Sequence, residues 1–140
     1  MQLTRHTDIS LRVLMHLTLF PGEICTVKEI AEKYDVSRNH LVKVVHRLSS
    51  LGYLKSSKGR GGGVTLAKKP EAITVGEIVR QMEATLDVID CRGTNCPLNP
   101  ACLLKHALAE STQLFLENLD TYTIADITKN RSQILKLVAG

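Results

Sequence analysis

Residues 26–52, TVKEIAEKYDVSRNHLVKVVHRLSSLG, decide the fold of this chain. Thr26 with Glu29 three residues later is a capping box, the pattern that begins a helix. Ser37 is the N-cap of a second helix, over residues 38–51, which ends at a glycine. Two capped helices separated by a turn of about three to four residues predict a helix-turn-helix, which is typical of proteins that lay a helix in the major groove of DNA.

The second helix of this motif divides into an apolar face and a polar face. Its apolar positions recur at helical spacing and predict the side that packs in the core: Leu41, Val44, Val45, Leu48 and Leu51. Its other positions are polar or basic and include no acid, which suits base edges and phosphates. His40 and His46 would also fit an ordinary solvated surface. The residues expected to contact DNA are Ser37, Arg38, Asn39, His40, Lys43, His46 and Arg47.

A β-hairpin is expected next along the chain. Two short strands, at residues 53–55 and 64–66, flank a segment with four glycines that also carries Lys58 and Arg60. This pattern predicts the wing of a winged helix, with Arg60 able to enter the narrow minor groove. A nucleotide-binding loop is excluded because a strand, and not a helix N-terminus, follows the glycines.

Helices are predicted on both sides of this region. Apolar residues at helical spacing predict a first helix over residues 5–20, and Thr74 with Glu77 reads as a second capping box. A long helix is expected from Pro100 to about Tyr122. Its apolar line consists of Leu104, Leu108, Phe115, Leu119 and Tyr122. A chain of 140 residues has little of its own to cover such a stripe, so we expect a homodimer.

Composition and charge agree with a DNA-binding module joined to a second element. Residues 1–69 hold 12 Lys and Arg against 5 Asp and Glu, a net charge of +7, whereas residues 70–140 carry a net charge of −3. We expect no membrane segment, no export signal and a cytoplasmic location. No set of nucleophile, base and acid stands out, so we do not expect an enzyme.

The predicted fold class is mainly α: a winged helix-turn-helix with a small β-hairpin wing and a long C-terminal dimerisation helix. We expect three parts along the sequence. Residues 1–84 would form the DNA-binding domain, residues 85–103 a cysteine loop, and residues 104–140 the dimerisation helix and C-terminal tail.

Three cysteines lie close together on a polar loop, at Cys91, Cys96 and Cys102. In a chain without an export signal, such a cluster favours a metal site over structural disulfides. Their C-x4-C-x5-C spacing does not choose the metal. Zinc on the cysteines and His106, a thiol redox switch, and reduced thiols packed as small hydrophobes remain alternatives. The fourth cysteine, Cys25, is expected to be a buried core thiol.

The chain resembles the bacterial winged-helix iron-sulfur repressors, a family that includes the regulators IscR and NsrR. The resemblance covers nearly the whole chain. Its motifs are Met1-Gln2-Leu3-Thr4, Thr7-Asp8, VSRNHLVK at residues 36–43, Gly61-Gly62-Gly63, the three cysteines with CPLNPAC at residues 96–102, and DTYTIAD at residues 120–126. The short gap between Cys91 and Cys96 is more similar to NsrR than to IscR, and His106 lies out of the register of the IscR histidine.

The resemblance implies a function and a cofactor. Proteins similar to NsrR hold a 4Fe-4S cluster on three cysteines, and an aspartate of the partner subunit, here Asp8, would be the fourth ligand. They repress transcription and release DNA when nitric oxide attacks the cluster. An IscR-like regulator of iron-sulfur status is the alternative within the family, and a 2Fe-2S cluster is the alternative cofactor. From the residues alone, Asp8 would be a solvated carboxylate near a helix start.

Overall fold

The structure is a computed structural model and describes residues 2–139 of the chain. Met1 and Gly140, at the outer ends of the expected DNA-binding domain and tail, lie outside the described residues. In chain order the elements are α1 (Arg5–Leu19), α2 (Val27–Lys33), α3 (Arg38–Ser50), β1 (Leu54–Ser57), β2 (Gly63–Leu66), η1 (Pro70–Ala72), α4 (Val75–Met82), η2 (Asn99–Ala101), α5 (Leu103–Asp120), η3 (Asp126–Thr128) and α6 (Arg131–Ala139).

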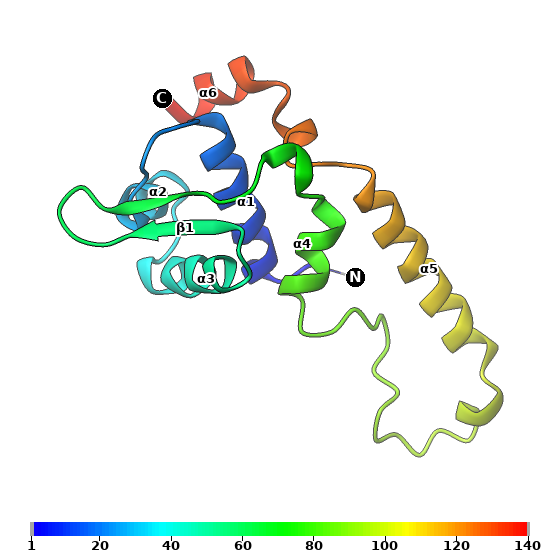
Figure 1. The fold of residues 1–140 in the computed structure, drawn as a ribbon. Helices are drawn as coiled ribbons and strands as arrows, with labels where there is room; N and C mark the ends of the chain where they lie inside the picture. The colour runs from blue at the N-terminus through cyan, green and yellow to red at the C-terminus, as the bar shows by residue number, and fades with distance from the viewer. Residues whose placement is uncertain (1, 140) are drawn as a thin grey trace.

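The elements form one body from which α5 and the cysteine loop extend (Figure 1). In that body α1 contacts α3 and α4, α2 packs on α3, and β1 and β2 form a two-stranded antiparallel hairpin. The hairpin and α5 lie at opposite ends of the molecule (Figure 1). The predicted fold class, a mainly α winged helix-turn-helix with a small hairpin, is confirmed. No helix within residues 2–139 is long and apolar enough to cross a membrane.

The helix starts follow the predicted caps, with one exception. Thr26 and Glu29 form the complete capping box of α2, and the Ser37 hydroxyl accepts from the His40 backbone N–H at the start of α3. At α4 only half of the predicted box forms. Thr74 accepts from the backbone N–H of Glu77, but the Glu77 carboxylate accepts from the Tyr53 hydroxyl instead of returning to the cap. Tertiary contact with the buried tyrosine therefore overrides the local pattern.

The core lies between α1, α3 and α4, and it includes the predicted apolar face of α3. Leu41, Val44, Val45 and Leu48 are buried, with Leu51 partly buried at the edge. Cys25 is also buried, as predicted, and its backbone pairs with Val64 of the hairpin. Burial raises the pKa of the Cys25 thiol, and Glu23 adds to this shift. This thiol is therefore a packing residue.

The hairpin is anchored to the core by the residue that precedes it. Tyr53 is 2% exposed, its hydroxyl donates to Glu77, and the Lys68 ammonium lies 4.4 Å from the ring centroid. Burial, together with the hydrogen bond to Glu77, raises the pKa of Tyr53. The strands are each slightly longer or later than predicted: β1 covers Leu54–Ser57 instead of 53–55, and β2 covers Gly63–Leu66 instead of 64–66. Leu54 pairs with Leu66, and Ser57 pairs with Gly63. The wing therefore has a fixed base and projects away from it.

The long helix differs from its prediction at both ends. A short 3-10 turn occupies Asn99–Ala101, Cys102 is the N-cap, and α5 runs from Leu103 to Asp120. At the far end Arg80 of α4 makes two hydrogen bonds to the Asp120 carboxylate, at 2.6 and 2.7 Å. The backbone of Gly76 on α4 lies so close that an added Cβ would be 2.1 Å from Asp120 Oδ1. The C-terminal end of α5 is thus fixed to the body.

The C-terminal helix α6 was not predicted. It packs near the end of α1, and Arg131 donates two hydrogen bonds to the backbone carbonyl of Leu19, at 3.1 and 2.8 Å. Phe20 ends α1 just after that carbonyl. The arginine therefore satisfies an acceptor at a helix C-terminus, where positive charge is favourable.

Because of His16, the free energy of unfolding is expected to decrease as the pH is lowered. This residue is 4% exposed on α1, with Nδ1 3.2 Å from the Tyr34 hydroxyl. Burial, with the nearby charge of Lys33, lowers the pKa of His16 to about 4. In the unfolded chain its pKa is about 6.5, so between these values the unfolded state binds the extra proton. This contribution to stability is complete above about pH 6.5 and is lost progressively toward pH 4.

Urea unfolding at pH 7, 6 and 5 measures this effect. Between pH 6 and 5 the free energy of unfolding of the wild type should fall by about 1 kcal/mol more than that of His16→Gln. His46→Gln, at an exposed histidine, is the control and should follow the wild type. Equal pH dependence in the wild type and in His16→Gln would contradict the prediction.

Candidate DNA-binding surface and cysteine loop

The outer side of α3 carries the polar residues predicted to contact DNA. Six of the seven are exposed: Ser37, Arg38, Asn39, Lys43, His46 and Arg47. Two are engaged by the protein itself. The His40 ring stacks on His6 of α1 at 5.9 Å between centroids, and Arg47 donates to the backbone carbonyl of Gln81 at 3.3 Å. Ser37 uses its hydroxyl as the helix cap.

Val42 is a residue of this surface that the sequence analysis missed. Its side chain is 48% exposed between Leu41 and Lys43 on α3. The signal was present in the pattern, because Val42 falls outside the buried stripe that includes Leu41 and Val45. An apolar side chain in a major groove can contact the methyl group of thymine. The exposed face of α3 therefore carries both polar and apolar side chains.

The wing tip exposes both predicted basic residues. Lys58 and Arg60 alternate with Gly59 and Gly61, whose φ angles are +91° and +76°. Such angles strain residues that have a Cβ, so the turn requires these glycines. Figure 1 shows the tip extended beyond the helices on the side away from α5. Lys58 and Arg60 are thus free to meet a phosphate backbone at a distance from α3.

Asp8 lies in the first turns of α1, where the negative charge is favourable. Its carboxylate is half-exposed and accepts from Arg12 Nε at 2.9 Å. Both side chains line an open groove of about 470 Å³ that reaches Tyr34 and Val36. An exposed pair at this spacing contributes at most about 0.5 kcal/mol, so Asp8 could exchange Arg12 for another partner at little cost.

The three clustered cysteines lie on the long segment between α4 and α5. Cys91 and Cys102 are partly exposed, Cys96 is exposed, and all three are free thiols. Apart from the turn at Asn99–Ala101, residues 84–102 form no helix or strand. Within residues 2–139 no three Cys, His, Asp or Glu side chains gather closely enough to hold a metal ion, and His106 joins no such group. The structure places the three predicted cysteine ligands on the segment between α4 and α5 and Asp8 on α1, and these side chains do not gather into one site.

The donor chemistry of this loop nevertheless suits a sulfur-ligated iron cluster. Thiolates are the usual ligands of such clusters, and three of them occur within 12 residues. Cys102 is the N-cap of α5 and makes no capping hydrogen bond, so its sulfur is available beside the free N–H groups of the first turn. A chain segment without regular hydrogen bonds can also adjust around a cluster.

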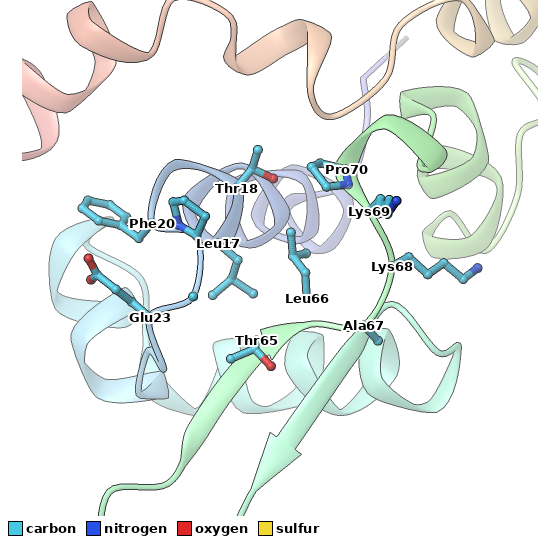
Figure 2. A pocket seen from close by; sticks show the side chains of 12 residues that line it. Leu17, Thr18, Phe20, Glu23, Thr65, Leu66, Ala67, Lys68, Lys69 and Pro70 are labelled. Carbon is cyan, nitrogen blue, oxygen red and sulfur yellow. The ribbon is translucent and has the colours of Figure 1, made fainter.

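A separate groove of about 490 Å³ lies between the end of α1 and the segment after β2 (Figure 2). Figure 2 shows Leu17 and Leu66 between these elements, whereas the Lys68 side chain extends away from them. The groove is lined by both apolar and polar side chains, among them Phe20, Glu23 and Lys69, and includes none of the cysteines.

Comparisons with known proteins agree with this architecture. The Rrf2 family, described as "Iron-dependent Transcriptional regulator", matches residues 3–130. The chain is 46% identical to the HTH-type transcriptional regulator NsrR of Bacillus subtilis (strain 168), over 99% of this chain and 97% of that protein. It is also 46% identical to the regulator of the same name from Shouchella clausii, over 99% and 95%.

Solved structures show the same fold. IscR of T. potens is 25% identical with a TM-score of 0.75, covering 93% of this chain and 88% of that one. CymR, the global cysteine regulator of B. subtilis, is 24% identical with a TM-score of 0.73, covering 93% and 98%. The family description and the names of the two NsrR relatives are those of transcriptional regulators, which agrees with the expectation that this chain is not an enzyme. The chain therefore belongs to the Rrf2 family of transcriptional regulators.

Proposed function

We propose that this chain is a homodimeric repressor that binds operator DNA and releases it in response to nitric oxide. The observation that carries the proposal is the loop of three free thiols. This loop lies between a winged helix-turn-helix and α5, a helix whose N-terminal part is exposed. The 46% identity to regulators named NsrR supports it. Binding would use α3 in the major groove and the wing tip on the adjacent minor groove or phosphates.

The dimer would form through α5. Its N-terminal part leaves Leu103 and Leu104 82% and 61% exposed, and Leu114 is 60% exposed. Leu103 and Leu114 are separated by about three helical turns and share one side of the helix. Exposed leucines along one helix face fit a second copy of the same helix related by twofold symmetry.

Part of the apolar line that was predicted to be left for a dimer partner packs inside the protomer. Leu116 is buried, and Phe115 and Leu119 are partly buried against the core, next to α4. Two members of the predicted apolar line are thus used within the protomer, and Leu104 stays exposed. Leu103 and Leu114, which define the proposed interface, lie outside the predicted line.

Cys91, Cys96 and Cys102 would hold the iron-sulfur cluster, with Asp8 of the second protomer as the fourth ligand. When bound, a 4Fe-4S cluster would supply iron atoms that react with nitric oxide. A carboxylate is a harder and more exchangeable ligand for such iron than a thiolate. The protein contributes the geometry: it would join α1 of one protomer to the cysteine loop of the other.

This connection would matter for DNA binding because the operator has a fixed spacing. Two recognition helices must reach half-sites about 34 Å apart. A site that ties α1 of one protomer to the partner restricts how the two winged helices can move. Losing that tie would allow other spacings, and specific binding would weaken.

Anaerobic reconstitution with iron and sulfide, followed by titration with nitric oxide, tests the proposal. Visible absorption would report the cluster, and fluorescence anisotropy would report binding to a duplex selected from a random library. We expect colour and tight DNA binding to decline together. A colourless protein that binds zinc and ignores nitric oxide would instead identify a zinc regulator, and loss of binding through disulfides without iron would identify a thiol switch.

A response to cluster loading but not to nitric oxide would favour the IscR-like alternative. In that case the protein would bind its duplex differently with and without the cluster, yet added nitric oxide would change neither colour nor binding. This outcome would overturn nitric oxide as the signal while keeping the DNA-binding role.

A further inference from the structure

Glu83 lies where three parts of the molecule meet. It is the C-cap of α4, with its backbone N–H bonded to the Val79 carbonyl, and it directly precedes the cysteine loop. Its carboxylate does not point along that loop. Instead, Oε1 accepts three hydrogen bonds from the start of α1: 2.7 Å from the Thr4 backbone N–H, 3.0 Å from the Thr4 hydroxyl and 2.5 Å from the Thr7 hydroxyl.

These contacts hold the first turn of α1 from outside the helix. Thr4 is the N-cap of α1, and Thr7 is fully buried. A carboxylate at this position satisfies free donors at the helix start and faces the positive end of the helix dipole. Partial burial raises the pKa of Glu83, but the hydrogen bonds from Thr7 and Thr4 outweigh it and hold the pKa below its ordinary value. The group is therefore ionised at neutral pH.

The same junction reaches the recognition helix. Arg47 of α3 donates to the carbonyl of Gln81, two residues before Glu83. On the α1 side, His6 lies between Thr4 and Asp8 and stacks on His40 in the first turn of α3, with an interplanar angle of 16°. One contact thus connects α3 to the end of α4, and the other connects α3 to the start of α1. Glu83 joins these same two segments.

We propose that Glu83 is a positioning residue that couples the cysteine loop to the recognition helix of the same protomer. The carboxylate links the loop start to the first turn of α1, and the His6–His40 and Arg47–Gln81 contacts carry that position to α3. Its role in switching rests on the proposed function. In that dimer each Asp8, one residue after Thr7, would bind the cluster of the partner. Each α1 helix would then be linked to the partner's cysteine loop through Asp8 and to its own cysteine loop through Glu83.

Two substitutions separate this role from a merely stabilising one. Glu83→Ala removes the acceptor for three donors, whereas Glu83→Gln keeps an acceptor oxygen in the same place. Glu71→Ala, at an exposed carboxylate on η1, is the matched control. For each variant we would measure the cluster content by absorption and the DNA affinity with and without the cluster, using the duplex selected with the wild type.

We expect the wild type to bind more tightly with the cluster than without it. In Glu83→Ala this ratio should fall by about tenfold, with the cluster content and the affinity of the iron-free protein unchanged. Glu83→Gln should restore much of the ratio, and Glu71→Ala should match the wild type. Equal weakening with and without the cluster would show that Glu83 only stabilises the fold, and an unchanged ratio would also overturn the coupling.

Hydrogen exchange on the iron-free protein gives a readout that does not need the cluster. Glu83→Ala should raise exchange in the first turn of α1 and also around His40 at the start of α3. Faster exchange confined to α1 would contradict the proposed connection between α1 and α3. A wild type without a cluster, or without a cluster-dependent change in DNA binding, would overturn the proposed function instead, and the exchange result would still decide whether Glu83 connects α1 to α3.

Discussion

Cys96→Ala is expected to yield a colourless protein whose affinity for its operator duplex falls by about 100-fold or more, toward the level of non-specific binding. The reason is that three sulfur ligands would hold the cluster, and two thiols with Asp8 of the partner would hold it far less well. Cys96 is exposed and makes no packing contact that the fold requires. The melting temperature of the iron-free protein should therefore stay unchanged.

Cys25→Ala is the matched control for this experiment. It also removes one thiol, but Cys25 is buried beside the hairpin and lies outside the loop. We expect it to keep its colour and its response to nitric oxide while losing some stability. Anaerobic absorption and anisotropy on both variants make the comparison. Tight operator binding by colourless Cys96→Ala would refute the role of the cluster in DNA binding.

The second large effect is expected from Leu114→Glu on α5. A charge on the face that we propose to pack against a second copy would have to be desolvated on association, so the variant should be monomeric at micromolar concentration. The loss of simultaneous binding at two half-sites should weaken operator binding by about 100-fold or more. Light scattering coupled to size exclusion measures the first result, and anisotropy measures the second.

Leu137→Glu provides the control for this substitution. Leu137 is 82% exposed on α6, so the same chemical change occurs at a leucine that belongs to another helix. We expect this variant to remain a dimer with wild-type DNA affinity. If Leu114→Glu also remains dimeric, α5 is not the interface, and the exposed leucines near its start must have another role.

The helix-turn-helix could be predicted from local signals alone. The caps at Thr26 and Ser37 and the apolar stripe of α3 depend on residues three or four positions apart, and the structure contains all of them. The hairpin was also predictable, because alternating residues and glycines define it locally. The candidate ligands Cys91, Cys96 and Cys102 followed from spacing, although their arrangement around a cluster stays a prediction.

Contacts between distant residues lay outside the reach of this reasoning. Glu77 was predicted to cap α4, but its carboxylate accepts a hydrogen bond from Tyr53, a buried residue 24 positions earlier. Glu83 carried no local signal, since its partners lie 79 and 76 positions away at the start of the chain. His16 is an ordinary helical histidine until the packing around it excludes water and lowers its pKa.

By itself, then, the sequence determined where helices begin, which residues face inward and which thiols lie close together along the chain, because these properties depend on neighbours in the sequence. Only the tertiary structure decided how α5 divides its leucines between the core and its exposed side, and which carboxylates meet hydroxyls or an arginine. Those outcomes depend on which surfaces meet when the chain folds, and burial then sets both the packing and the charge state of each group.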